Sequence, residues 1–107
     1  MRFLRRVPQL HAVGLAERLD DRRLLVLDVR EPREWRRGHI RGSHNVPLSQ
    51  LAGRLSRIPL DRPVVTVCAS GHRSAAAARI LMRACYEVEN LAGGLTRWSR
   101  AGLPLAR

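Results

Sequence analysis

A cysteine in a short loop is the residue of this sequence best placed to act as a nucleophile. Cys68 follows the β-branched run Val64-Val65-Thr66-Val67 and precedes an alanine-rich run that begins after Ser74. The first run favours a buried strand and the second favours a helix, so Cys68 lies just before a helix N-terminus. Free backbone N–H groups and the positive end of the helix dipole favour a thiolate there. The segment predicts an anion cradle built around a nucleophilic cysteine.

The residues after Cys68 are expected to bind an anionic substrate. They are Ala69, Ser70, Gly71, His72 and Arg73. We expect Arg73 to meet the anion, because a cation in the first turn of a helix is unfavourable without one and a guanidinium offers several donors in a fixed fork. His72 either lines the mouth of the loop or is an ordinary surface histidine.

Three further residues are assigned supporting roles. Asp28 closes an apolar run and is expected to organise neighbouring loop N–H groups. Arg30 either adds to a positive rim or pairs with Glu31 or Glu34. Ser74, directly after Arg73, is the third supporting residue.

The second cysteine is given a structural interpretation. Cys85 lies at the end of the alanine-rich run, away from any anion-binding pattern, and is expected to pack as a small hydrophobe, with a resolving thiol as the alternative. The two cysteines form neither a CxxC pair nor a disulfide framework, and the four histidines are scattered. No metal site is therefore expected.

Length and composition predict one small domain over residues 1–107, with residues 1–7 as a loosely ordered lead-in. No apolar run is long enough to cross a membrane, and the N-terminus lacks the apolar stretch of a secretion signal, so a cytoplasmic location is expected. The net charge of +11 comes from 20 arginines spread along the chain without lysine. This scatter predicts no specific nucleic-acid binding, although a positive field would help to recruit a small anion.

Short strand candidates alternate with short helix candidates along the chain. Strands are expected over 24–29, 43–46, 63–67 and 87–91; helices are expected over 12–20, 31–35, 48–55 and 74–84, with a final one after Gly93-Gly94. Such alternation predicts an α/β domain with a mainly parallel sheet and helices on both faces. Ligands of such sheets bind beyond the carboxyl ends of the strands, which is where Asp28 and Cys68 lie.

Four segments together resemble the rhodanese family, and specifically its single-domain sulfurtransferases. They are Leu27–Pro32 with Glu34-Trp35; Gly38–Ser43 with Asn45-Val46-Pro47; Cys68–Ser74; and Leu91–Gly94 with Trp98 and Ala101–Pro104. The resemblance covers roughly residues 8–105. It implies a rhodanese-like fold with a central five-stranded, mainly parallel sheet. The cysteine, Gly71 and Arg73 of the loop match active members of the family.

The resemblance also implies a reaction, that of a thiosulfate sulfurtransferase without metal or organic cofactor. Cys68 would take the outer sulfur of thiosulfate or a related persulfide donor and pass it to cyanide or a thiol. A thiolate suits this step because it is a soft nucleophile that can hold the sulfur as a persulfide. A protein that donates or accepts persulfide would be a further partner.

Three other interpretations remain open from the sequence alone. One is a sulfur-relay or sensing module that takes persulfide from a protein partner. Another is a cysteine phosphatase or arsenate reductase, which the loop disfavours because four residues, not five, separate Cys68 from Arg73 and because Val67 replaces the usual preceding histidine. The last is an inactive interaction domain, in which no persulfide forms.

Overall fold

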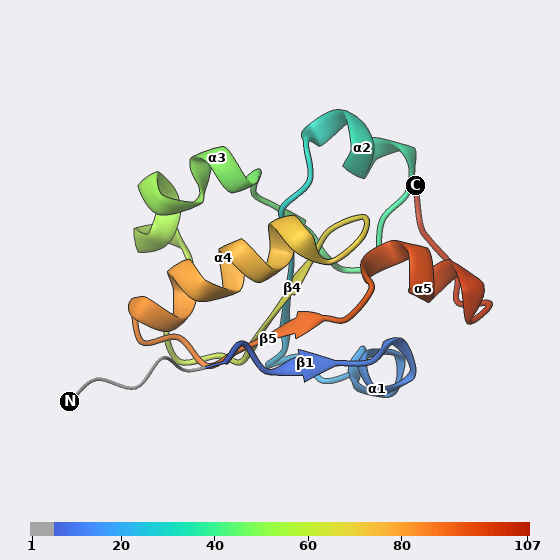
Figure 1. Cartoon of the computed structure of the whole chain (residues 1–107), viewed down its shortest axis with the longest axis horizontal. Helices are drawn as coiled ribbons and strands as arrows, with labels where there is room; N and C mark the ends of the chain where they lie inside the picture. Colours follow the sequence, from blue (N-terminus) through green and yellow to red (C-terminus); the bar gives the residue numbers. More distant parts are fainter. Residues whose placement is uncertain (1–5) are drawn as a thin grey trace.

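Five parallel strands form one sheet through the centre of the molecule (Figure 1). The computed structural model describes residues 6–107. The strands are β1 (Gln9–Leu10), β2 (Leu25–Asp28), β3 (His44–Asn45), β4 (Val64–Val67) and β5 (Val88–Leu91). Their order is β1-β5-β4-β2-β3, and every neighbouring pair is parallel. The predicted α/β class with a five-stranded parallel sheet is confirmed.

Helices cover both faces of the sheet. They are α1 (Ala12–Arg18), α2 (Pro32–Arg37), α3 (Leu48–Leu51), the 3₁₀ helix η1 (Ala52–Arg57), α4 (His72–Arg83) and α5 (Gly94–Arg100). Successive residues of a strand point to opposite faces, so Val64 packs with α3 and α4 whereas Val65 packs with α1 and α5. All four β4 residues are buried, which explains why this strand reads as a continuous apolar run in the sequence.

Short β1 was not predicted, because two residues carry no readable strand pattern. It pairs with β5 through Gln9 opposite Asn90 and Leu10 opposite Leu91. Just before it, Val7 packs against the core, so the predicted loose lead-in does not extend through residue 7. Residues 1–5 of that lead-in lie outside the described residues.

The predicted helix over 48–55 is the other local difference. It begins as the α-helical turn α3 and continues as the 3₁₀ helix η1 to Arg57. Along the described part of the chain, no helix has the length and apolar character needed to span a membrane.

Candidate active site

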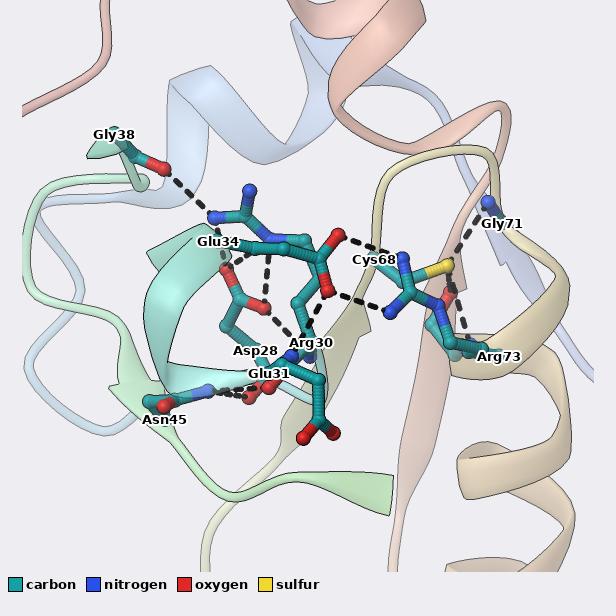
Figure 2. Close-up of polar contacts among 10 residues, drawn as sticks. Asp28, Arg30, Glu31, Glu34, Gly38, Asn45, Cys68, Gly71 and Arg73 are labelled. Atoms are coloured by element: carbon teal, nitrogen blue, oxygen red, sulfur yellow. Dashed lines mark hydrogen bonds and ion pairs between the residues drawn. The ribbon is translucent and has the colours of Figure 1, made fainter. Parts of the chain in front are cut away.

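Cys68 follows β4 directly, at the carboxyl edge of the sheet, and its sulfur is ringed by hydrogen-bond donors (Figure 2). The backbone N–H of Gly71 donates to Sγ at 3.1 Å, and that of Ser74 donates at 3.3 Å. The Ser74 hydroxyl donates to the same sulfur at 3.2 Å. The Cys68 side chain is fully buried, at 0% exposure. The sulfur therefore sits at the floor of the loop, with three donors directed at it.

Glycine at position 71 allows this loop to close around the sulfur. Gly71 adopts φ +101°, in the region that disfavours residues with a Cβ. A Cβ there would also approach the Gly93 nitrogen to 3.3 Å. Helix α4 begins immediately afterwards at His72, two residues earlier than the sequence predicts. Its first turn thus contains His72, Arg73 and Ser74, next to the sulfur.

The surroundings of Cys68 shift its ionisation toward the thiolate. Burial raises the pKa of the Cys68 thiol, because it penalises the charged form. The hydrogen bonds from the Ser74 hydroxyl and from the Ser74 and Gly71 N–H groups act in the opposite direction and outweigh it. The net result is a Cys68 pKa below its ordinary value. A lowered thiol pKa is typical of a nucleophilic cysteine.

The N-terminus of α5 holds the carbonyl side of the same loop. Leu95 N–H donates to the Cys68 carbonyl at 2.9 Å, and Thr96 N–H donates to the Ala69 carbonyl at 3.0 Å. A Cβ on Gly94 would lie 2.4 Å from the Cys68 oxygen, so this close approach requires glycine. The Cys68 and Ala69 carbonyls point toward α5, whereas the N–H groups of Gly71 and Ser74 point toward the sulfur. Gly94 thus allows the start of α5 to pack directly against the loop.

Buried polar side chains of the sheet secure the loop from below. Thr66 donates its hydroxyl to the Ser74 carbonyl at 2.9 Å, and the Asn90 amide donates to the Gly71 carbonyl at 3.3 Å. Both residues are buried, at 0% and 3% exposure. A buried polar group that loses its partner is costly, so these bonds favour one loop conformation.

Asp28 and Arg30 form a buried ion pair at the end of β2. The Arg30 Nη2 lies 2.8 Å from Asp28 Oδ2, and Arg30 Nε donates to Oδ1 at 3.0 Å. Asp28 also accepts the Arg30 backbone N–H at 3.0 Å, the organising role that the sequence predicts. The predictions for Arg30 are wrong: it is buried, it lies on no exposed rim, and it pairs with Asp28 instead of Glu31 or Glu34. Asp28 is the last residue of β2 and Arg30 follows two residues later, so the two side chains lie together at the same end of the strand.

Arg73 pairs with a carboxylate that the sequence analysis did not assign to the site. Arg73 Nη1 lies 2.7 Å from Glu34 Oε1, and Nη2 lies 3.0 Å from Oε2. The Arg73 hydrogen bond lowers the pKa of Glu34 to about 2, against a smaller opposing effect of burial. The anion that a first-turn cation requires is thus present within the protein itself. In the sequence, Glu34 stood out as part of one of the four family-like segments and as a possible partner of Arg30, and no local pattern linked it to Arg73.

Comparison with known proteins agrees with this architecture. The family model described as Rhodanese-like domain matches residues 12–101. The chain belongs to the rhodanese-like domain family.

Individual relatives of this rhodanese-like domain cover most of its length. It is 40% identical over 101 residues to a protein named sulfurtransferase from Allochromatium vinosum, covering 92% of this chain and 94% of that one. It is 45% identical over 78 residues to the uncharacterized protein YqhL of Bacillus subtilis, covering 72% of this chain and 62% of that protein's length. The crystal structure of a rhodanese-related protein from Thermoplasma volcanium superimposes with TM-score 0.87 at 33% identity, covering 92% and 97% of the two chains. These similarities support sulfur transfer as the general chemistry of the site.

The remaining predicted residues of this rhodanese-like domain lie at the loop surface. Ala69 is partly buried, whereas Ser70 and His72 are exposed, and the Ser70 hydroxyl lies 3.1 Å from His72 Nδ1. His72 therefore faces solvent beside the loop, a position that fits either of its two interpretations.

The packing role predicted for Cys85 is wrong. Cys85 is exposed and adopts φ +71°, because the chain reverses direction directly after α4. The 12 residues of α4 separate it from Cys68 by about 18 Å at the rise of an α-helix. A disulfide needs Cα atoms within about 7 Å, so this geometry rules out Cys85 as an intramolecular resolving thiol for Cys68.

Proposed function

We propose that this rhodanese-like domain is a sulfurtransferase that carries a sulfane sulfur as a Cys68 persulfide. The observation that carries the proposal is the group of three donors on Cys68 Sγ, two from backbone amides and one from Ser74. These donors stabilise negative charge on the attacking sulfur. The relative named sulfurtransferase, alike over nearly the whole chain, supports the same chemistry.

The first half-reaction loads the enzyme. The Cys68 thiolate attacks the outer sulfur of thiosulfate, a new S–S bond forms, and the original S–S bond breaks with its electron pair leaving on sulfite. With a hydropersulfide donor, the leaving group is the donor's thiolate. In the second half-reaction, cyanide or a thiolate attacks the outer sulfur and the Cys68 thiolate leaves. Such double displacement gives ping-pong kinetics.

Donor access requires movement at the site. The Cys68 side chain has no exposed surface in this structure, so neighbouring side chains must move aside before a donor reaches the sulfur. The loop residues Ala69–Arg73 form the rim across which it enters. We propose that their backbone N–H groups hold the donor anion during entry, as the sequence predicts.

Intact mass spectrometry after incubation with millimolar thiosulfate tests the proposal. We expect the wild-type protein to gain one sulfur atom, and Cys68→Ala to gain none. Cys85→Ser, which removes the exposed thiol at the far end of α4, should load like the wild type. Addition of cyanide should then remove the mass increment and release thiocyanate. A wild-type protein that gains sulfur from neither thiosulfate nor a hydropersulfide, or a Cys68→Ala variant that gains it, would contradict the proposal.

A further inference from the structure

Arg73, the cation of the Cys68 loop, already forms an ion pair with Glu34. Glu34 engages both terminal nitrogens of Arg73, at 2.7 and 3.0 Å (Figure 2). A donor sulfonate would need these same nitrogens, because a guanidinium binds an oxyanion through a pair of parallel N–H groups. The two side chains are 39% and 33% exposed, so an incoming anion can reach the pair.

Glu34 is held in place by its own helix. It is the N3 residue of the α2 capping box, in which the Glu31 backbone N–H donates to Glu34 Oε1 at 3.0 Å. The end of α2 is fastened separately, because buried Arg30 donates to the Gly38 carbonyl at 2.7 Å. The carboxylate therefore approaches Arg73 from a fixed element and remains ionised at neutral pH.

We propose that Glu34 determines donor selectivity: it occupies Arg73 and thereby disfavours dianionic donors such as thiosulfate relative to the hydropersulfide of a thiol. This inference rests on the proposed function. Thiosulfate must displace the Glu34 carboxylate from Arg73 and then remain beside it, and like charges at close range oppose binding. A hydropersulfide brings no sulfonate and can react while the Glu34–Arg73 pair stays intact.

The persulfide reaction is balanced without any further reagent. The Cys68 thiolate attacks the terminal sulfur of the donor, the new Cys68 S–S bond forms, and the donor's S–S bond breaks. The donor leaves as its thiolate, and the proton of the terminal sulfur stays on the Cys68 persulfide or passes to solvent. Arg73 takes no part in this step.

Binding of thiosulfate to an unreactive protein tests the inference independently of catalysis. In a Cys68→Ser background, calorimetry would compare the parent with Glu34→Gln. We expect about fivefold tighter thiosulfate binding to Glu34→Gln, the upper range for release of a partly exposed ion pair. Glutamine retains an oxygen for the Glu31 N–H and so preserves the capping box. Unchanged or weaker binding would overturn the inference.

Two control variants isolate the role of Arg73. Glu31→Gln removes an equal charge at the N-cap of the same helix, where the side chain is exposed. Among the described residues Arg73 pairs with Glu34 and not with Glu31, so this variant should leave thiosulfate binding within about twofold of the parent, as expected for a screened surface charge. Adding Arg73→Gln to Glu34→Gln should abolish the tighter thiosulfate binding expected for Glu34→Gln alone. If Glu31→Gln tightened binding as much as Glu34→Gln, only overall charge would matter and the inference would fail.

Donor competition in the otherwise native enzyme completes the test. Glu34→Gln should raise kcat/KM for thiosulfate and leave it nearly constant for the hydropersulfide of uncharged 2-mercaptoethanol. An equal gain with both donors would refute selectivity by Glu34. Failure of both donors to load Cys68 would instead refute the proposed function, and the calorimetric result would still report on Glu34.

Discussion

Replacing Ser74 with alanine removes one of the three donors to the Cys68 sulfur and leaves the other two in place. The Ser74 hydroxyl lies 3.2 Å from Sγ, whereas the Ser74 and Gly71 amides belong to the backbone and survive the substitution. A hydrogen bond to a charged group contributes about 1.5 kcal/mol at the lower end of its range. Its loss should reduce the thiolate population about tenfold at a pH below the pKa of the thiol.

The ultraviolet absorbance of the thiolate, followed against pH, measures this change without a reagent that must reach the buried sulfur. A Cys85→Ser background removes the exposed thiol from the signal. We expect the Cys68 titration to move to higher pH in Ser74→Ala, and the rate of sulfur loading to fall about tenfold with it at a pH below both titration midpoints.

Ser70→Ala provides the matched control within the same loop. The Ser70 hydroxyl contacts His72 and not the sulfur, so this variant should keep the parental titration. Thermal unfolding would show whether Ser74→Ala remains folded, since Ser74 is fully buried. A folded Ser74→Ala protein with an unchanged thiolate titration would show that the hydroxyl does not stabilise the charge on Cys68.

Three further predictions concern the framework of the site. The pKa of Glu34 falls from 4.5 to about 2 on pairing with Arg73, so this pair stabilises the fold above pH 4.5 and loses its effect as the pH falls toward 2. Discounted for its exposure, that contribution to the free energy of unfolding is about 1 kcal/mol. Denaturant titrations should show Glu34→Gln less stable than the wild type at pH 7 but equally stable near pH 2. A stability difference that does not change with pH would refute this prediction. Gly71→Ala should cost about 1–2 kcal/mol in the same titrations and slow sulfur loading, because alanine is strained at φ +101°; wild-type values for both would contradict the need for glycine. Asp28→Ala leaves the buried Arg30 guanidinium without its partner and should cost about 3–5 kcal/mol, with a marked drop in melting temperature; a loss under about 1 kcal/mol would show that the pair is not a structural requirement.

Local patterns in the sequence predicted the sheet and the position of the nucleophile because those features depend on neighbouring residues. The apolar run of β4 and the alanines of α4 could each be interpreted without knowledge of the rest of the chain. Fully buried Ala77 and Ala78 let α4 lie close to the sheet. The family-like segments extended this interpretation to the whole fold. The single-domain organisation, the cytoplasmic location and the absence of nucleic-acid binding stay predictions.

Features that depend on contacts between distant segments could not be predicted from local patterns in the sequence. The two-residue strand β1 exists only because β5 lies beside it. Exposure of Cys85 depends on a left-handed backbone turn after α4 that no local pattern of residues indicates. The α5 amides that hold the loop come from residues more than two dozen positions beyond Cys68.

By itself, the sequence determined that a cysteine would end a buried strand and face the start of a helix, because strand and helix preferences act over a few residues. Only the tertiary structure decided which charges meet. Glu34 and Arg73 are 39 positions apart and come together because α2 and the start of α4 share the carboxyl edge of one sheet. Electrostatic pairing acts through space, so the partner of each charge follows from the fold and not from the order of the residues.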